Sequence, residues 1–465
     1  MPIRSAALAL AALLSLTATV GAQTATTGQT GQTGQTGQQG GQTGVGGIFV
    51  DAQGVVAPAF ARDKKLDEKR RLEVANKALP GDVNVFSPLR KVSLVQLEKA
   101  CEEYAAKKLD VPSEMSYLAG LQRVDYVFVY PETKDIVIAG PAEGFVIDSV
   151  TRATGITTKR PPLRLDDLIV ALRVMERGGE LGCSIDPVRE NLSRMTAYLN
   201  NNSSPATTDV AKSRFNEMQR ILGLQDVRVF GVPADSHFAN MLVEADYRMK
   251  LLSIGLEQPP VKGLRSHLSM IPAGQNAMQR FWFTPLYDGF VKSGDGLAYQ
   301  FKGPRAQLLA QEEMVSVTGQ RSQAAFTKIS TNRFAKLFTE KFPELADAEP
   351  IFAELQTGID LAVLAALFKK ERIAEAAGWD KALFLDAERC KIATYNVPRK
   401  VMSAMNYKSG GSKLLIGLIG GGVTIDAFRA INSGEYLLDD DNVVQKLHAK
   451  ARPEKLPEQH LWWWD

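Results

Sequence analysis

The stretch DVRVFGVPADSHFANMLVEADYRMK, residues 226–250, contains both kinds of element from which this chain is predicted to be built. Its first seven residues have the alternation and the β-branched side chains of a strand. Pro233 and Ala234 then lead into a helix that begins at Asp235 or Ser236, because either side chain can cap a first turn. A strand that turns directly into a helix predicts a fold of mixed α and β structure.

The predicted helix has one polar and one apolar side. The polar side carries His237, Asn240, Glu244 and Arg248, and the apolar side carries Phe238, Leu242, Ala245, Met249 and Leu252. Two acid–base pairs at i,i+4 spacing, Glu244–Arg248 and Asp246–Lys250, stabilise an exposed helix by about 0.3–0.5 kcal/mol each. These pairs account for both carboxylates without chemistry.

Three interpretations of this helix stay open. It is a structural helix, a non-catalytic site for a ligand or partner, or part of an acid–base site. Ligands often bind beside a strand-to-helix turn, because backbone N–H groups point outward there. His237 and Asn240 are the polar residues that neither the cap nor the ion pairs explain.

Outward from this helix, the clearest strand signal is VDYVFVYPETKDIVIAGPAEGFVIDSV, residues 124–150. It predicts two or three strands with a turn at residues 131–134. Before it, Ser93 and Gln96 form a capping box for a helix that runs to about Leu109.

Later segments add strands and helices in irregular order. Asp186 is predicted to cap a helix with Pro187 at its first position. RFWFTPLY (280–287) and GLAYQFKG (296–303) are predicted strands separated by a Gly-Asp-Gly turn.

A mainly helical segment is predicted near residues 320–377, and within it GIDLAVLAALFKK (358–370) is apolar nearly all round, as in a buried helix. KLLIGLIGGGVTI (413–425) is typical of a tightly packed strand or turn. The sequence therefore predicts an α+β fold of mixed helices and short antiparallel strands.

The length of 465 residues predicts two or three domains. We expect an N-terminal α+β domain at 48–222, a C-terminal α+β domain at 223–435 and a charged tail at 436–465. The chain has 55 basic and 52 acidic residues, so its charge gives no reason to expect nucleic acid as a partner.

The N-terminus predicts export. MPIRSAALALAALLSLTATVGAQ has an early Arg4, an apolar run and small residues at Val20 and Ala22, which fits a signal peptide at 1–22. Residues 23–47 are rich in Gly, Gln and Thr and predict a disordered linker, either an idle tail or a spacer. No later segment has about 18 consecutive apolar residues, so we expect no transmembrane segment in the mature chain and a periplasmic or secreted location.

Cysteines and motifs give little sign of chemistry. Cys101, Cys183 and Cys390 are far apart, and Cys101 lies on an apolar helix stripe where a buried thiol is expected. The sequence has no CxxC pair or Cys/His cluster, so we expect no metal site, and no motif predicts a cofactor. The motifs GxSxG, HExxH, GxxxxGK[ST] and GxGxxG are absent.

Several stretches resemble one known family. GVPADSHFANMLVEADYRMK with the following IGLEQPP, RVDYVFVYPETKDIVIAGPAEGF and GGVTID are similar to segments of the exported planctomycete-type bacterial proteins that carry domain of unknown function 1598. The resemblance covers about residues 45–435 and is strongest at 226–260. It implies export and a cell-envelope setting, but the family has no assigned activity and no catalytic residues.

The C-terminus ends in Trp462, Trp463 and Trp464. These indoles are predicted to fold back onto the domain or a partner, to lie at a membrane interface, or to stack on a carbohydrate ring. A detachable tail anchor is the hypothesis that they suggest.

The sequence as a whole favours a non-enzymatic cell-envelope or secretory binding or scaffolding protein, whose partner is a protein or carbohydrate of the envelope. The alternative is a hydrolase or transferase with a site assembled around His237 and carboxylates distant in sequence. Catalytic residues cannot be named from the sequence.

The signal-peptide pattern generates a first prediction. The exported protein is expected to begin at Gln23, because the small residues at positions 20 and 22 fit cleavage after Ala22. N-terminal sequencing of the exported form checks this. Exported protein that retains Met1 would contradict it.

Overall fold

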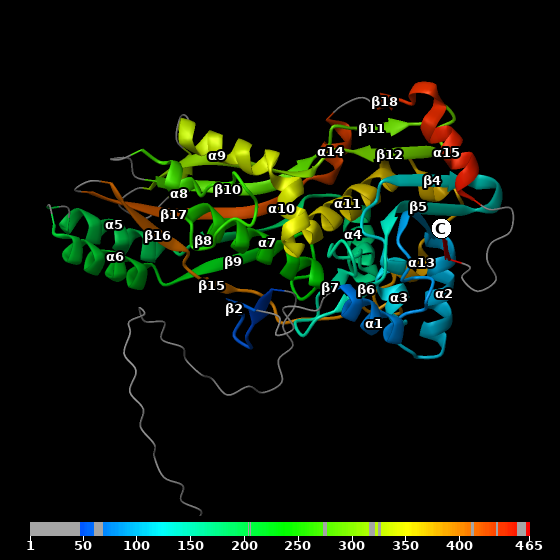
Figure 1. Cartoon of the computed structure of the whole chain (residues 1–465), viewed down its shortest axis with the longest axis horizontal. Helices are drawn as coiled ribbons and strands as arrows, with labels where there is room; N and C mark the ends of the chain where they lie inside the picture. Colours follow the sequence, from blue (N-terminus) through cyan, green and yellow to red (C-terminus); the bar gives the residue numbers. More distant parts are fainter. Residues whose placement is uncertain are drawn as a thin grey trace, which may run out of the picture. The chain divides into compact units, whose positions relative to one another are not determined.

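The computed structural model describes residues 47–59, 68–202, 204, 206–272, 277–315, 321–323, 327–410, 413–433, 436–452 and 462–465. The predicted signal peptide, and the predicted linker up to residue 46, lie outside the described residues. The described chain belongs to one compact unit. It combines sheets and helices in the α+β arrangement that the sequence predicts (Figure 1).

The first sheet contains ten of the described strands. In spatial order they are β1 (Ile48–Val50), β2 (Val55–Pro58), β15 (Lys400–Met402), β9 (Leu224–Phe230), β8 (Leu181–Pro187), β17 (Lys413–Ile425), β10 (Ala277–Leu286), β13 (Arg305–Val315) and β14 (Arg321–Gln323), with β16 (Met405–Gly410) also paired to β17. Most neighbours are antiparallel, but β10 and β17 run parallel. This sheet is more mixed, and β17 is longer, than the short antiparallel strands that were predicted.

The second sheet contains seven of the described strands and lies to the right in Figure 1. Its order is β18 (Leu437–Leu438), β11 (Gly289–Lys292), β12 (Ala298–Lys302), β4 (Tyr126–Tyr130), β5 (Asp135–Ala142), β3 (Ser87–Ser93) and β19 (Trp463–Trp464). A separate hairpin pairs β6 (Phe145–Ile147) with β7 (Ala153–Gly155).

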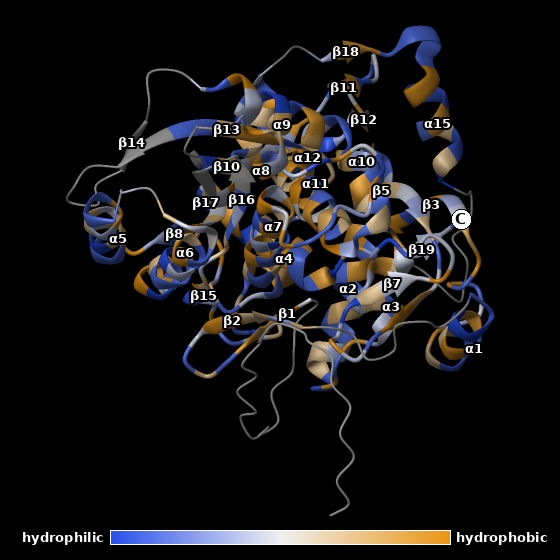
Figure 2. Cartoon of the chain, turned by 60° about the vertical axis from the view of Figure 1, so that its left-hand side comes forward, coloured by the Kyte–Doolittle hydropathy of each residue, from blue (hydrophilic) through white to orange (hydrophobic). Residues whose placement is uncertain are grey.

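Helices pack on and between these sheets. They are α1 (Glu68–Ala78), α2 (Leu94–Ala106), α3 (Ser113–Ser116), α4 (Leu165–Arg177), α5 (Arg189–Asn201), α6 (Thr208–Leu222), α7 (His237–Ile254), α8 (His267–Met270), α9 (Ile329–Glu340), α10 (Phe342–Ala348), α11 (Pro350–Lys370), α12 (Ile373–Ala376), α13 (Ala382–Leu385), α14 (Ala427–Asn432) and α15 (Val443–Ala451), with 3-10 turns at η1 (Leu118–Gly120), η2 (Pro131–Thr133) and η3 (Asp440–Asn442). Figure 2 shows the peripheral α5 largely in hydrophilic colours, whereas the central α11 is largely hydrophobic.

Helix α11 is the centre of the core. Pro350 stands at its first turn, where a missing N–H costs no hydrogen bond, and every residue from Ile351 to Phe368 is buried. It contacts α4, α7, α10, α14 and β13. It is long and apolar enough to cross a membrane, but the protein buries Ile351 to Phe368. The buried helix predicted at 358–370 is confirmed except for Lys369 and Lys370, which are exposed.

The strand β10 shows how one face of the first sheet joins this core. Phe281 and Phe283 are fully buried and contact phenylalanines of α9, α10 and α11. Side chains alternate along a strand, so Arg280, Trp282 and Thr284 lie on the opposite face.

Several local predictions are confirmed. Residues 131–134 turn between β4 and β5. Ser93 caps α2 by accepting the N–H of Gln96, although α2 ends at Ala106 and not near Leu109. Cys101 is buried with a free thiol. The mainly helical segment near 320–377 contains α9 to α12.

Two local predictions are wrong. Asp186 and Pro187 belong to the end of β8, and α5 starts at Arg189 with Val188 as its cap residue. Because the pairing of β8 with β9 extends to Pro187, Asp186 and Pro187 are strand residues and the helix starts after them. The Gly-Asp-Gly turn joins β11 to β12, while RFWFTPLY pairs with β13 and β17.

The predicted boundary near residue 222 falls between α6 and β9. Strands from both sides of it pair in the first sheet, because β8 lies beside β9. The predicted tail at 436–465 contributes β18 and β19 to the second sheet, with α15 between them in sequence.

Candidate functional site

The turn that leads into α7 is fixed by Ser236. Its hydroxyl oxygen accepts the N–H of Ala239 at 3.1 Å and donates to the carbonyl oxygen of Pro233 at 2.7 Å. Of the two predicted caps, Ser236 is therefore the N-cap of α7. Asp235 precedes it, and its carbonyl oxygen accepts the N–H of Tyr395 at 2.7 Å.

Helix α7 has no exposed polar side. It contacts β17 and β8 of the first sheet and also helices α11 and α4, and all its residues except Arg248 are buried. The predicted apolar side is confirmed as buried, but the expectation that Glu244, Asp246 and Lys250 lie in solvent is wrong. Elements on both sides of the helix enclose it, so its polar residues need partners from elsewhere in the chain.

Glu244 finds its partner far away in sequence. Its carboxylate lies 2.8 Å from Arg152, and it also accepts the N–H of Gly47 at 3.0 Å. The same guanidinium binds Glu354 of α11 at 2.8 Å, so one arginine is shared between two buried carboxylates. Burial raises the pKa of Glu244 despite the opposing effect of Arg152.

The predicted pair of Glu244 with Arg248 is wrong. Arg248 instead binds Glu257 at 2.8 Å and Glu349 at 3.2 Å, near the surface. The i,i+4 spacing permits the predicted contact, but Glu244 points inward to Arg152 and leaves Arg248 to the outer acids.

The second predicted pair, Asp246 with Lys250, is present at 3.7 Å but is completely buried. Lys250 also donates to the carbonyl oxygen of Ile185 at 2.6 Å. A Cβ atom at Gly421 would lie 2.1 Å from Asp246 and 2.5 Å from Lys250, so the glycine-rich part of β17 makes room for this pair.

His237 also has a carboxylate partner. Its Nδ1 lies 2.8 Å from Oδ2 of Asp167 in α4, the geometry in which an Nδ1–H donates to a carboxylate. His237 is 5% exposed and Asp167 is 4% exposed. Asn240 donates to the carbonyl oxygen of Ser236 at 3.2 Å, and so it reinforces the turn of the helix.

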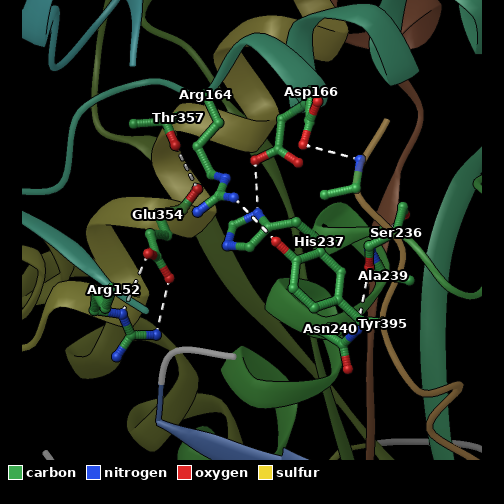
Figure 3. A network of polar contacts seen from close by, with 12 residues as sticks. Arg152, Arg164, Asp166, Ser236, His237, Ala239, Asn240, Glu354, Thr357 and Tyr395 are labelled. Atoms are coloured by element: carbon green, nitrogen blue, oxygen red, sulfur yellow. Dashed lines mark hydrogen bonds and ion pairs between the residues drawn. The ribbon is translucent and has the colours of Figure 1, made fainter. Parts of the chain in front are cut away.

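Around this histidine, Arg164 and Tyr395 complete a polar cluster. Figure 3 shows Arg164, Tyr395 and His237 turned toward one another, with Arg152 and Glu354 on the neighbouring side. Arg164 donates to the hydroxyl oxygens of Tyr395 at 3.1 Å and Tyr117 at 3.3 Å. Burial raises the pKa of Tyr395, so its hydroxyl stays protonated at neutral pH.

Chemically, the His237–Asp167 pair has the orientation of a general base, because Asp167 fixes the imidazole through Nδ1. A general base must also reach the proton that it removes. A cavity of about 1140 Å³ between α8 and α9 and one of about 410 Å³ beside Trp282 are both lined by other residues. The geometry provides an oriented imidazole in an enclosed position.

Most residues of this cluster could not be predicted from the sequence. Asp167 lies 70 residues before His237, and at the start of α4 it is typical of an acid that complements the helix dipole. Arg164 is the N-cap residue of α4, close to Asp167, whereas Arg152, Glu354 and Tyr395 come from three further segments. These residues are brought together only in the folded structure.

The three terminal tryptophans are buried in the second sheet. Trp463 and Trp464 form β19 beside β3, and the indole N–H of Trp464 donates to the carbonyl oxygen of Ala451 at 2.7 Å. The guanidinium of Arg90 lies 4.6 Å from the centre of the Trp463 ring and binds Asp465 at 2.8 Å. Of the three predicted roles, the structure has the one in which the indoles fold back onto the domain.

The shared guanidinium of Arg152 generates a second prediction. Arg152→Met is expected to lower the free energy of unfolding by about 3–5 kcal/mol, because it leaves two buried carboxylates facing each other without a cation. Chemical denaturation followed by circular dichroism measures this change.

The matched control is Arg248→Met, which removes an arginine that also binds two glutamates but near the surface. Its side chain and both of its partners are partly exposed, so it is expected to cost clearly less than Arg152→Met. Adding Glu244→Gln and Glu354→Gln to Arg152→Met should restore much of the lost stability. Equal costs for the two arginine variants would contradict the structural role of Arg152.

A third prediction concerns pH. Burial raises the pKa of Asp246 to about 7, against the opposing charge of Lys250. The folded protein then holds this proton more tightly than the unfolded chain, so the contribution of Asp246 to stability falls as the pH rises from about 4 to about 7. Asp246→Asn should therefore gain stability relative to wild type over this window, which melting temperatures at each pH measure.

The control for this series is Asp209→Asn on the exposed side of α6. Its difference from wild type should stay constant between about pH 5 and pH 7, because this side chain is exposed to water in the folded protein as in the unfolded chain. If the difference in melting temperature between Asp246→Asn and wild type is also constant over this range, the pKa of Asp246 is not raised.

Comparison with known proteins gives one match. Residues 183–267 match a family described as a protein of unknown function (DUF1598). The matched stretch runs from β8 to the first residue of α8 and contains α7 with His237 and Glu244, but not Asp167, Arg152 or Glu354. Neither the curated proteins nor the solved structures yield a match. The stretch from β8 to the start of α8 is thus similar to a domain of unknown function, and it contains the helix around which the polar cluster is built.

Proposed function

We propose that this protein is an exported binding or scaffolding protein of the cell envelope or of the secreted fraction, and that His237 has a structural role in it. The observation that carries the proposal is the enclosure of the His237–Asp167 pair between α4 and α7. An imidazole that is 5% exposed, with its carboxylate partner 4% exposed, is positioned to hold two helices together.

The neighbouring polar groups support the same conclusion. The Arg164 guanidinium binds the hydroxyls of Tyr117 and Tyr395, and the Arg152 guanidinium binds Glu244 and Glu354. Each of these contacts joins segments that are distant in sequence. Buried polar groups that satisfy one another in this way stabilise one packing of the core.

Export is part of the proposal and rests on the N-terminal sequence. The apolar run and the small residues before Gln23 have the pattern of a signal peptide, and a Gly/Gln/Thr-rich segment separates it from the first strand. A protein or carbohydrate of the envelope is the partner that this location favours.

One observation favours the competing function, a hydrolase or transferase. The Nδ1 atom of His237 bonds a carboxylate, and this leaves Nε2 as the atom that would take a proton. A conformational opening between α4 and α7 would be needed to admit a substrate.

A fourth prediction separates these functions with two substitutions. His237→Asn keeps a nitrogen donor near the Nδ1 position but removes the titratable ring, whereas His237→Ala removes both. If the role is structural, His237→Ala should lose about 1–3 kcal/mol of stability and His237→Asn clearly less. Thermal and chemical unfolding of the full chain measure this.

Function is assayed on the same proteins. Immobilised wild type and immobilised His237→Asn should capture the same component from a solubilised envelope extract. Capture should be half-maximal at the same amount of extract for both proteins. A hydrolase would instead show turnover on ester, phosphoester or glycoside chromogenic substrates that both variants abolish while His237→Asn melts like wild type. That outcome would replace the binding proposal with the enzymatic one.

A further inference from the structure

The first sheet has one face that helices cover only in part. On this face, Leu418 of β17 packs with α5 and α6 in a small apolar cluster at one end of the sheet, which Figure 1 shows to the left. Trp282 of β10 lies farther along the same face, in register with Gly422 of β17 and Leu309 of β13. Trp282 is half-buried and Leu309 is 37% exposed.

On β17, the residue paired with Trp282 is Gly422, which has no side chain. A Cβ atom at this position would lie 2.6 Å from the carbonyl oxygen of Cys183, so the close approach of β8 and β17 requires glycine there. Trp282 lines a hollow together with Leu309 of β13 and Thr424 of β17.

This hollow, the Trp282 pocket, has a volume of about 410 Å³, within the usual range for small-molecule sites. Trp282 and Leu309 supply apolar surface, while Thr284, Gln307 and Thr424 supply hydroxyl and amide groups from three adjacent strands. The rim beyond β17 carries Asp426 and Arg429.

The polar groups of the pocket are available to a ligand. Among the described residues, no protein group hydrogen-bonds the side chains of Thr284, Gln307 or Thr424. Asp426 uses Oδ1 to accept the N–H of Arg429 at 2.8 Å, which caps α14. Its second oxygen and the exposed guanidinium of Arg429 remain at the rim.

The charged residues around the pocket favour a neutral ligand over an anionic one. Glu180 and Asp426 carry two negative charges, and Arg429 carries one positive charge. A phosphate or nucleotide needs an excess of positive charge, so this rim disfavours it. A neutral ligand with many hydroxyls is compatible with carboxylate, amide and guanidinium groups together.

We propose that the Trp282 pocket binds a neutral oligosaccharide, with the C–H face of one pyranose ring packed on the indole. The apolar face of the sugar matches the flat ring, and its hydroxyl groups reach Gln307, Thr284, Thr424 and Asp426. This inference rests on the proposed binding function and specifies the ligand class.

The experiment uses the full chain and four named probes, cellotetraose, maltotetraose, chitotetraose and mannotetraose. Isothermal titration calorimetry is expected to detect binding of at least one probe. Trp282→Ala should weaken this binding by about tenfold or more, since an aromatic anchor is removed. Trp282→Phe should weaken it less, because an aromatic ring remains.

Two further variants keep the test independent of folding. Gln307→Ala removes a polar contact without touching the indole and should also weaken binding. Phe86→Ala removes an aromatic ring that is 54% exposed outside the pocket and should leave the affinity unchanged. Melting curves confirm that the variants compared are folded.

The proposal is overturned if wild type binds none of the four probes at about 10 mM, or if Trp282→Ala and Gln307→Ala both bind like wild type. It is also overturned if inorganic phosphate binds at Trp282 and the sugars do not. Capture of an envelope component that persists in Trp282→Ala would leave the binding function standing and reject only the sugar site.

Discussion

The guanidinium of Arg152 joins three parts of the chain that are remote in sequence. Arg152 belongs to the turn between β6 and β7, and its guanidinium reaches Glu244 on α7 and Glu354 on α11. The backbone N–H of Gly47, the first described residue, donates to Glu244 as well. Since all three charged groups are buried, the hairpin and the two helices must meet in one relative position for any of them to be satisfied.

This constraint explains why α7 can be buried on all sides although its sequence carries several polar residues. Three of its inward polar groups have partners from other elements: Arg152 for Glu244, Asp167 for His237, and the backbone of β8 for Lys250. Asp246 and Asn240 instead contact Lys250 and the cap residue Ser236 of the same helix. A buried ion pair adds little net stability compared with apolar side chains of similar size. Its main effect is to favour one packing arrangement over others. In this chain it fixes how α4, α7 and α11 lie against the first sheet.

Local features of the fold could be predicted from the sequence. Ser93 and Ser236 cap helices because their side chains act within three residues, and residues 358–368 are buried because they are apolar all round. The predicted Glu244–Arg248 pair failed for a related reason. Helical spacing tells which residues share a side of the helix, but it does not tell whether that side meets water or another buried element.

The candidate sites depended on contacts that no local pattern contains. His237 could be singled out from the sequence, but Asp167 was hidden among the acids expected at a helix start. Trp282 was predicted to lie on a strand, and only the parallel pairing of β10 with β17 sets it beside Gly422. Parallel neighbours are separated by long stretches of sequence, so this register is invisible without the fold.

The ends of both sheets have a consequence for solubility. Along the main order of the described strands, each sheet finishes on strands of only two or three residues: β1 and β14 in the first, β18 and β19 in the second. A long, flat edge strand offers unpaired N–H and C=O groups on which another chain can extend the sheet, and this leads to aggregation. β19, held by Arg90 through Asp465, covers the seven-residue edge of β3 in this way. The tryptophan-rich end thereby protects the folded protein from edge-to-edge association.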